Sequence, residues 1–201
     1  MAGTNSSEIR IAGVGRLYVA AADTPVPSTF SDDTVTDWTG WTNLGFTSGD
    51  GVTFSKKDKL EPVDVWQAVS PVHFVYSDRD LTLKFSLMQF NKDNLKFFMG
   101  GGDVKAVGSS TDVFQYDITD RPYAETRALG LEFTDVKAGG AEAVTYRFCI
   151  GRGQVTASDD IKLARKAPAQ LGITFTAMAP KDGAALASFV MKDSAYKTAA
   201  A

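Results

Sequence analysis

The sequence predicts a mainly β protein, an antiparallel β-sandwich or barrel with one short flanking helix and long loop and terminal arms. Several long runs alternate apolar and polar residues with a period of two, which is typical of half-buried strands in antiparallel sheets. One segment, at residues 91–99, combines the three-and-four residue spacing of a helix with residues that cap both ends. The 201 residues include 13 Phe, 6 Tyr and 3 Trp, which is enough aromatic mass for one substantial core.

The first strand is expected at residues 15–21, where apolar and polar residues alternate. The stretch 23–39 is rich in Pro, Ser, Thr and Asp, and we interpret it as a loop with no packing face. A short strand is expected at 42–47. The sequence Ser-Gly-Asp-Gly at 48–51 then predicts a turn that lets residues 52–55 pair with that strand.

Residues 56–77 are the least regular stretch. It contains two prolines, and its charged and apolar residues are mixed without a steady period. A connection of this length is unusual inside a compact domain and is commonly functional. We therefore interpret it as an extended arm that gains order only against a neighbouring subunit. The residues assigned to that contact are Lys56, Lys57, Lys59, Val63, Val65, Trp66 and Pro71.

The clearest strand is expected at residues 80–90. Apolar residues occupy the odd positions from Leu81 to Leu87, and polar residues occupy the even positions between them. The apolar side changes at Met88 and Phe90. A bulge or the end of the strand is therefore expected there.

One helix is expected at residues 91–99. Asn91 is a good N-cap residue, and Gly100 can adopt the left-handed conformation that ends many helices. The side chains expected to pack this helix against the sheet are Leu95, Phe98 and Met99.

Two further long strands are expected at 126–133 and 143–150. They alternate apolar and polar residues on either side of the Ala-Gly-Gly sequence at 138–140. This arrangement predicts an antiparallel hairpin.

Another alternating run predicts a strand at 169–177. Shorter strands are expected at 113–118 and 154–158. The Gly-Arg-Gly sequence at 151–153 is interpreted as the tight connection that precedes the second of these. Residues 182–201 suggest a short helix or strand followed by an alanine-rich end.

The charge balance argues against a protein that grips nucleic acid. The formal net charge is −3 and the sequence pI is about 5.2, whereas DNA-binding proteins concentrate Lys and Arg on one face. The one dense basic stretch, at residues 56–59, is interrupted by Asp58 and followed by Glu61. A solvated loop is the favoured interpretation of it.

No catalytic or metal-binding constellation emerges from the residue types. The single histidine, His73, lies in a strand-like apolar run, and a half-buried strand histidine is favoured over a general base. The single cysteine, Cys149, allows no intrachain disulfide, which fits a reducing cytoplasm. One Cys and one His are too few for the usual zinc sites. We expect no enzyme activity, no cofactor and no bound metal.

The sequence also shows no recognisable targeting or membrane-spanning signal. No basic start with a following apolar run indicates a secretory signal. No stretch approaches the ~20 apolar residues that cross a bilayer. Membrane insertion of this chain is not expected.

Four features in a fixed order resemble a known family. They are the strand sequence GRLYVA at 15–20, the pair WTNLGFTS and DGVTFS at 41–48 and 50–55, the segment from Val65 to Val72, and the strand at 81–90 that runs into NKDNL and Gly-Gly-Gly. Over residues 13–180 this order is similar to that of the major tail tube proteins of siphophages that infect actinobacteria.

The resemblance implies a phage tail tube fold and a structural role in the virion. It implies hexameric rings, joined by sheets that continue across subunit boundaries and stacked into a tube. The tube would hold a tape-measure protein, meet tail terminator and tail-tip proteins, and later conduct double-stranded DNA without specific binding. Residues 1–12 would be an N-terminal arm, 13–180 the tube domain and 181–201 a C-terminal segment. The stretch 56–77 takes the place of the loop that bridges rings.

A conduit for DNA is expected to have a wall that does not bind phosphate strongly. DNA carries about one charge per 1.7 Å of axis, so a basic wall would hold it through counterion release. Six copies at −3 each give a ring a formal charge of −18. The residues proposed to face the lumen are Thr82, Ser86, Glu132, Thr174 and Thr176. Lys84 lies among them and argues against a simple assignment of this face.

Three other functions compete with this interpretation. The tube protein of a contractile tail or secretion system would share the fold. A β-sandwich carbohydrate-binding module would need exposed aromatic residues, for which Trp38, Trp41 and Trp66 are the available tryptophans. A hydrolase is disfavoured by the residue inventory.

Overall fold

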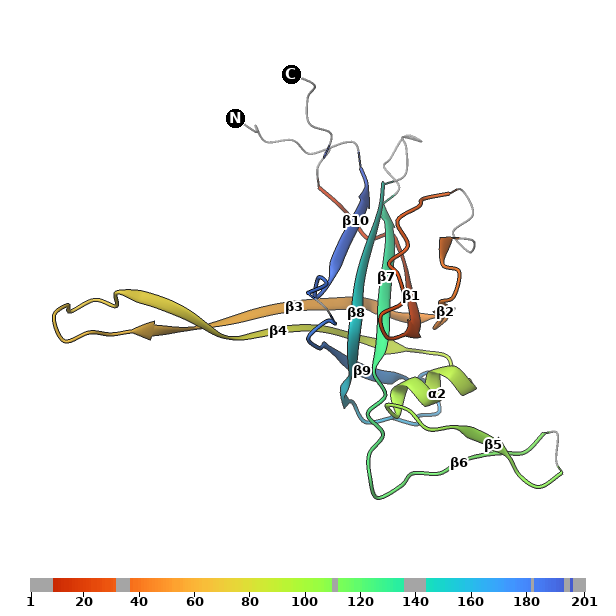
Figure 1. The fold of residues 1–201 in the computed structure, drawn as a ribbon. Coiled ribbons are helices and arrows are strands. Elements are labelled where there is room, and N and C mark those ends of the chain that lie inside the picture. The colour runs from red at the N-terminus through yellow and green to blue at the C-terminus, as the bar shows by residue number, and fades with distance from the viewer. Residues whose placement is uncertain are drawn as a thin grey trace.

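The computed structural model describes residues 9–31, 37–109, 112–135, 144–181, 183–193 and 196. Within them the chain forms ten strands and the helix α2 (Figure 1). The elements are β1 (Val14–Ala21), β2 (Thr42–Asn43), β3 (Thr47–Val63), β4 (His73–Leu87), α2 (Lys92–Phe98), β5 (Val104–Ala106), β6 (Phe114–Tyr116), β7 (Arg127–Asp135), β8 (Val144–Ser158), β9 (Leu171–Ala177) and β10 (Ser188–Lys192).

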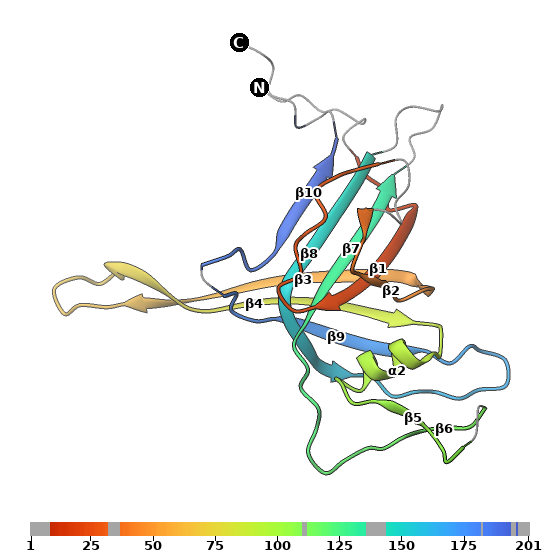
Figure 2. The ribbon, with the colours of Figure 1, turned by 45° about the vertical axis from the view of Figure 1, so that its right-hand side comes forward.

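The predicted antiparallel β architecture is confirmed. The main sheet has the strand order β2-β1-β7-β8-β9-β4-β3, and β10 pairs with β8 beside it. β8 joins two groups of strands, since its first half pairs with β7 and β10 and its last part pairs with β9. Figure 2 shows β1, β7 and β10 running steeply across the direction of β3, β4 and β9. The two groups therefore pack face against face.

The core lies between these two groups. The odd-numbered apolar residues of β4 are buried as predicted, from Leu81 at 7% exposure to Leu83 and Leu87 at 0%. They meet Ile173 and Phe175 of β9, and the opposing group supplies buried apolar residues to the same cluster. Complete burial of such a side chain stabilises the fold by about 1.5–3 kcal/mol. Alternation along β4 and β9 therefore fixes which face of the sheet is inside.

The helix is confirmed, and its packing side agrees in part with the prediction. Asn91 caps it by accepting a hydrogen bond from the Asn94 backbone N–H at 2.8 Å. Phe98 is buried and Met99 packs half-buried against the core, as expected, whereas Leu95 is only half-buried and Phe97, which was not predicted, is buried in the core. The helix is turned because the fully buried Asn94 side chain donates to two backbone carbonyls, those of Leu44 and Gln89, each at 2.9 Å. Because Asn94 faces inward, Phe97, three residues later on the same side of the helix, faces inward as well.

The interpretation of 151–153 as a tight connection is wrong. The segment continues β8, and Gly153 pairs with Arg127 on one side and Ala177 on the other. A Cβ atom at Gly153 would lie 2.4 Å from the Thr176 carbonyl oxygen and 2.5 Å from the Phe175 ring. The glycine is needed for this close approach rather than for a turn.

The expected strand at 42–47 and turn at 48–51 also need correction. Only Thr42 and Asn43 are paired as β2, while β3 already begins at Thr47. The turn sequence lies inside β3, where the register with β4 shifts between Thr47 and Val52. Gly51 takes a φ of 73° there, so the segment is an irregularity within one strand.

The predicted pairing of the segments around 126–133 and 143–150 is confirmed, because β7 and β8 pair antiparallel from Leu129–Ile150 to Asp135–Val144. The predicted turn at 138–140 lies outside the described residues. The strand expected at 113–118 is found as β6, and the one expected at 154–158 is the end of β8.

Candidate assembly surfaces

A two-stranded arm projects from the body of the protein. Beyond the buried Leu81, β3 and β4 continue to pair from Lys57–Asp80 to Val63–His73, with one register shift after Lys59. Figures 1 and 2 show this ribbon extending away from all other elements. An extended arm was predicted here, with order gained only against a neighbouring subunit. The structure instead pairs its two strands with each other within the chain.

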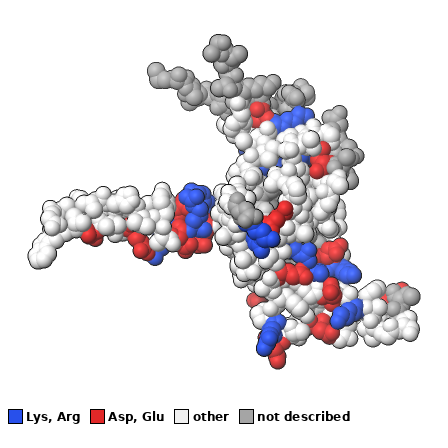
Figure 3. Space-filling view, in the orientation of Figure 1, with Lys and Arg blue, Asp and Glu red and all other residues white. Residues whose placement is uncertain are grey.

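Most charged residues of the arm lie at its base. Asp58 accepts hydrogen bonds from Lys56 Nζ at 2.6 Å and from Arg79 Nε at 2.7 Å. These hydrogen bonds lower the pKa of Asp58 below its ordinary value. Lys59 Nζ lies 2.9 Å from Glu61 Oε1. Figure 3 shows blue and red atoms gathered where the arm leaves the body and mostly white atoms beyond them.

The distal part of the arm is apolar and exposed. Trp66 and Val69 are fully exposed, and Tyr76 is 64% exposed. The exposed large apolar residues of this region are Leu60, Val63, Val65, Trp66, Val69, Val72, Phe74, Val75 and Tyr76. Of the residues assigned to the contact, the three lysines lie at the base, and Val63, Val65, Trp66 and Pro71 lie at or near the tip. Such a patch on one projection is typical of a protein–protein contact surface.

A second surface is the polar face of β4 and β9, opposite the core. Thr82 pairs with Thr176 and Lys84 pairs with Thr174, so the four side chains share one face with Ser86. The Thr176 hydroxyl lies 2.7 Å from that of Thr156. Lys84 Nζ lies 3.4 Å from Asp159 Oδ1. Four of the five residues proposed for a lumen are thus brought together on a surface rich in hydroxyl groups.

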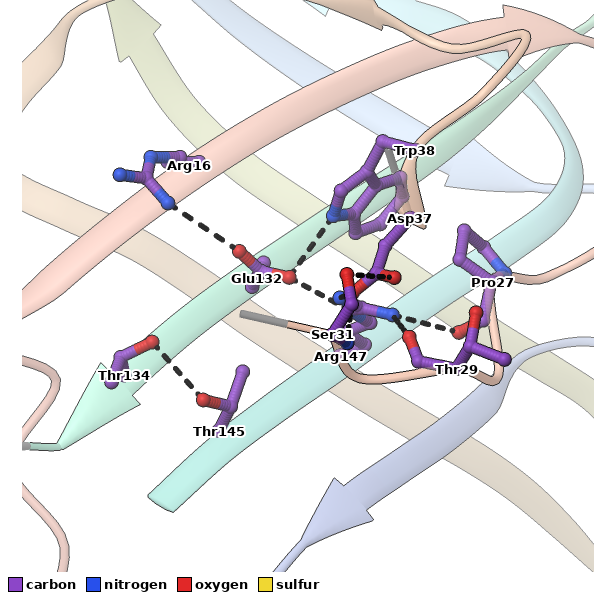
Figure 4. A network of polar contacts seen from close by, with 10 residues as sticks. All are labelled: Arg16, Pro27, Thr29, Ser31, Asp37, Trp38, Glu132, Thr134, Thr145 and Arg147. Carbon is purple, nitrogen blue, oxygen red and sulfur yellow. Dashed lines mark hydrogen bonds and ion pairs between the residues drawn. The ribbon is translucent and has the colours of Figure 1, made fainter. Parts of the chain in front are cut away.

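Glu132, the fifth, does not belong to that surface. It is 2% exposed and lies on β7 beneath the loop that precedes β2. Its Oε2 accepts hydrogen bonds from Trp38 Nε1 at 3.0 Å and from Arg147 Nε at 2.7 Å (Figure 4). The assignment of Glu132 to a lumen is therefore wrong, because its alternating position points to a face that the loop covers.

Arg147 fastens that loop to the sheet. Its Nη2 lies 2.8 Å from Asp37 Oδ2, and its Nη1 donates to the carbonyl oxygens of Pro27 and Thr29 (Figure 4). Trp38 stacks on Tyr18 with a 4.1 Å separation of ring centres. The expectation that 23–39 has no packing face is wrong.

The electrostatics of this network are those of a structural site. Burial disfavours the charged form of Asp37, but hydrogen bonds from Arg147 and Ser31 outweigh burial and hold its pKa below the ordinary value. A paired carboxylate and a guanidinium can hold a loop in place. Sequence reasoning missed Arg147, although an arginine between the apolar residues of a strand is a usable signal for a buried pair.

A third cluster joins segments from the two ends of the described chain. Asp193 Oδ2 lies 2.5 Å from both Arg10 Nη2 and the Tyr146 hydroxyl, and Arg10 Nε donates to the Tyr146 oxygen at 3.1 Å. Burial and the hydrogen bond to Asp193 raise the pKa of Tyr146 to about 12. The cluster fastens the approach to β1 and the segment after β10 to the same strand, β8.

Reactive residue types are not gathered in the described part of the chain. His73 lies exposed on the arm, and burial raises the pKa of the Cys149 thiol to about 12. The described residues contain no cluster of three His, Cys, Asp or Glu side chains that could hold a metal ion. No described helix is long and apolar enough to cross a bilayer. The surfaces above are suited to contact between macromolecules.

Comparison with known proteins identifies a family. A family model described as "Phage tail tube protein" matches residues 2–201. Among solved structures, the chain is similar to one in the cryo-EM structure of an extracellular contractile injection system, the PVC sheath–tube complex in its extended state. The identity is 11%, the TM-score is 0.38, and the match covers 94% of this chain and 99% of that one. No curated protein matches.

Proposed function

The chain belongs to the phage tail tube protein family, and we propose that it forms hexameric rings that stack into the tail tube of a siphophage. The lumen of this tube holds the tape-measure protein during assembly and afterwards conducts double-stranded DNA into the host. Tail terminator and tail-tip proteins meet its two ends. The subunit acts as a structural protein of the virion.

The arm is the observation that carries this proposal. From Leu81 to His73 the ribbon extends roughly 25 Å beyond the buried core, at about 3.3 Å per residue. Exposed apolar residues at its far end favour association with another chain over a free monomer in water. In a stacked tube the same residues are covered by another ring. This supports the role of bridging rings for residues 56–77.

The open edges of the sheet support ring formation. β3 lies at one end of the strand order, and the last part of β8 pairs with β9 on one side. An unpaired edge offers backbone donors and acceptors to another strand. In a closed ring every such edge is paired by the neighbouring copy, so that the sheets continue from subunit to subunit.

The polar face of β4 and β9 suits the wall of the lumen. Thr82, Ser86, Thr174 and Thr176 offer hydroxyl groups without fixed charge. The cation among them, Lys84, has Asp159 3.4 Å away. Contact with such a surface releases few of the counterions that surround DNA, so the surface binds DNA only weakly.

Electron microscopy of the purified chain at high concentration tests the proposal. The expected result is rings with six-fold symmetry and a central bore, and stacks of such rings. A protein that stays monomeric at every concentration, and that binds glycans on an array, would instead be a carbohydrate-binding module.

A further inference from the structure

The arm requires a receptor, and we propose that its distal part, Leu60–Tyr76, docks on the loop between β8 and β9, residues 159–170, of a second copy of this chain. The inference rests on the proposed function, since it identifies the surface that receives the arm in a stacked tube.

The distal arm has a net negative charge. Residues 60–76 contain Asp64 and Glu61, the latter 2.9 Å from Lys59 at the base, and no Lys or Arg. Their apolar side chains are exposed, including Trp66 and Val69 at the tip. A matching receptor therefore needs positive charge beside an apolar contact.

The outer part of the β8–β9 loop has the opposite charge. Residues 161–170 contain Lys162, Arg165 and Lys166 and no Asp or Glu. A bridge between Ala164 and Ala167 places Arg165 and Lys166 at the tip of a turn. Among the described residues, none of the three cations has a carboxylate within 4.0 Å.

An exposed apolar residue accompanies these cations. Leu163, beside Lys162, is 83% exposed. The two aspartates of the loop, Asp159 and Asp160, are its first residues, and Asp159 faces Lys84 of the polar face. The outer part of the loop therefore offers the combination of positive charge and apolar surface that the arm requires.

The two surfaces lie at opposite ends of the same strands and cannot meet within one chain. Leu171, which follows the loop, pairs with Leu87 at the end of β4, whereas the arm tip follows the Val63–His73 pair at its beginning. β4 has 15 residues, so its ends lie roughly 46 Å apart at about 3.3 Å per residue. Figure 2 shows the arm and the loop on opposite sides of the body.

A contact between different surfaces at opposite ends repeats from copy to copy. Such a heterologous contact builds open stacks rather than closed pairs. In a stack of rings each ring presents one set of arms and one set of loops, so weak single contacts act together. The opposite charges also fix which end of one ring meets the next.

Another apolar surface fits the arm less well. A slot of about 480 Å³ lies between the starts of β1 and β3 and is lined mainly by apolar groups, among them Phe54, Phe148 and Phe189. Its one cation, Arg16, already lies 3.7 Å from Glu132. The slot can cover apolar side chains, but it lacks the group of cations that would match Glu61 and Asp64.

Charge reversal tests the contact. The variant E61K/D64K reverses the arm, and K162E/R165E/K166E reverses the loop. Each is expected to lower the pelletable tube fraction about tenfold while single rings remain, and combining both sets is expected to restore it to about the wild-type value. The matched control K92E/K105E/R121E reverses three exposed cations elsewhere and is expected to leave assembly unchanged. Circular dichroism shows whether each variant is folded.

Each outcome separates this inference from the proposed function. If the wild type and both reversed variants all form normal tubes, the proposed contact is wrong and the tube function is unaffected. Failure of the combined variant, when folded, also overturns the contact. A wild-type chain that forms no rings removes the proposed function and the inference with it.

Cysteine pairing gives an independent readout, because the native Cys149 is buried. The variant V69C/L163C is expected to form disulfide-linked ladders in assembled tubes. Ladders from V69C/A12C in place of these would move the receptor to the apolar slot and overturn the inference.

Discussion

Glu132 on β7 and Arg147 on β8 are direct cross-strand neighbours whose side chains meet at 2.7 Å, each almost fully buried beneath the loop that carries Trp38. The same guanidinium reaches Asp37, so one cation holds two carboxylates and two loop carbonyls. Removing one partner of a buried pair leaves an uncompensated charge, which is more costly than losing the pair as a whole.

Replacement of Arg147 by Met is therefore expected to lower the free energy of unfolding by about 3–5 kcal/mol. Urea denaturation followed by tryptophan fluorescence measures this change. The control R152M removes an arginine that is partly exposed and paired with Asp23 at 2.8 Å, and it is expected to cost about 0–1 kcal/mol. Equal losses in the two variants would contradict the structural role of the network.

Shortening the arm is expected to stop assembly without unfolding the subunit. Lys59 and Asp78 are paired across the ribbon, so residues 60–77 can be replaced by Asn-Gly, which closes a two-residue hairpin. The core stays intact because the removed residues are exposed. Negative-stain microscopy is expected to show no long tubes, with the melting temperature unchanged. Long tubes from this variant would refute the bridging role of the arm.

A single substitution at the tip separates the arm from other exposed apolar residues. Trp66→Ser removes a fully exposed ring, so the stability of the subunit is expected to stay constant while the tube yield falls several-fold. Ile118→Ser, at a site 79% exposed outside the arm, is the control and is expected to leave the yield unchanged. The same loss of tubes in both variants would mean that general surface hydrophobicity drives assembly.

The sequence predicted strands correctly where packing against the core makes apolar and polar residues alternate. β4 and β9 were predicted because Leu83, Phe85 and Phe175 alternate with residues that face solvent. The arm shows no such period, because neither of its faces covers a core. The pairing of β3 with β4 along the arm was not predicted for the same reason. The role of the arm as an extended contact segment remains a proposal.

Buried charge was the other source of error. Glu132 was placed on an exposed face because a carboxylate at a polar strand position is usually solvated. The partner that makes its burial possible, Arg147, comes from another strand, and the cover comes from a loop more than 90 residues earlier in the chain. A local pattern cannot indicate such a contact. The burial of Phe97 was missed in the same way, because Asn94 donates to the carbonyl oxygen of Leu44, 50 residues earlier in the chain.

A positive charge in the proposed lumen is expected to turn the tube into a DNA-binding tube. Thr174→Lys places a second cation opposite Lys84 on the polar face. Each ring gains six charges, so DNA retention by tubes is expected to rise at least tenfold at low salt and to fall steeply with added salt. Filter binding measures this. Thr119→Lys, on an exposed loop away from the face, is the control, and equal retention by both would contradict the lumen assignment.

The cluster of Tyr146, Arg10 and Asp193 predicts a pH-dependent contribution to stability. The pKa of Tyr146 is raised from 10.0 to about 12 in the folded chain, so its contribution is fully present below pH 10 and is lost as the pH rises through about 12. The difference in melting temperature between wild type and Tyr146→Phe should therefore shrink between pH 10 and 12. A difference that stays constant over this range would show that the hydroxyl proton is not held by Asp193.

Two glycines in β8 give a test of the corrected strand. A Cβ at Gly153 would meet the Thr176 carbonyl oxygen at 2.4 Å and the Phe175 ring at 2.5 Å, whereas a Cβ at Gly151 would meet nothing within 4 Å. Gly153→Ala is therefore expected to lower the free energy of unfolding by about 1–3 kcal/mol, as overpacking does in a close-packed core. Gly151→Ala is expected to be neutral or slightly stabilising, since alanine reduces the freedom of the unfolded chain. If both glycines belonged to a tight turn, the two substitutions would have similar effects, so the difference in urea midpoint between them reports directly on the path of β8.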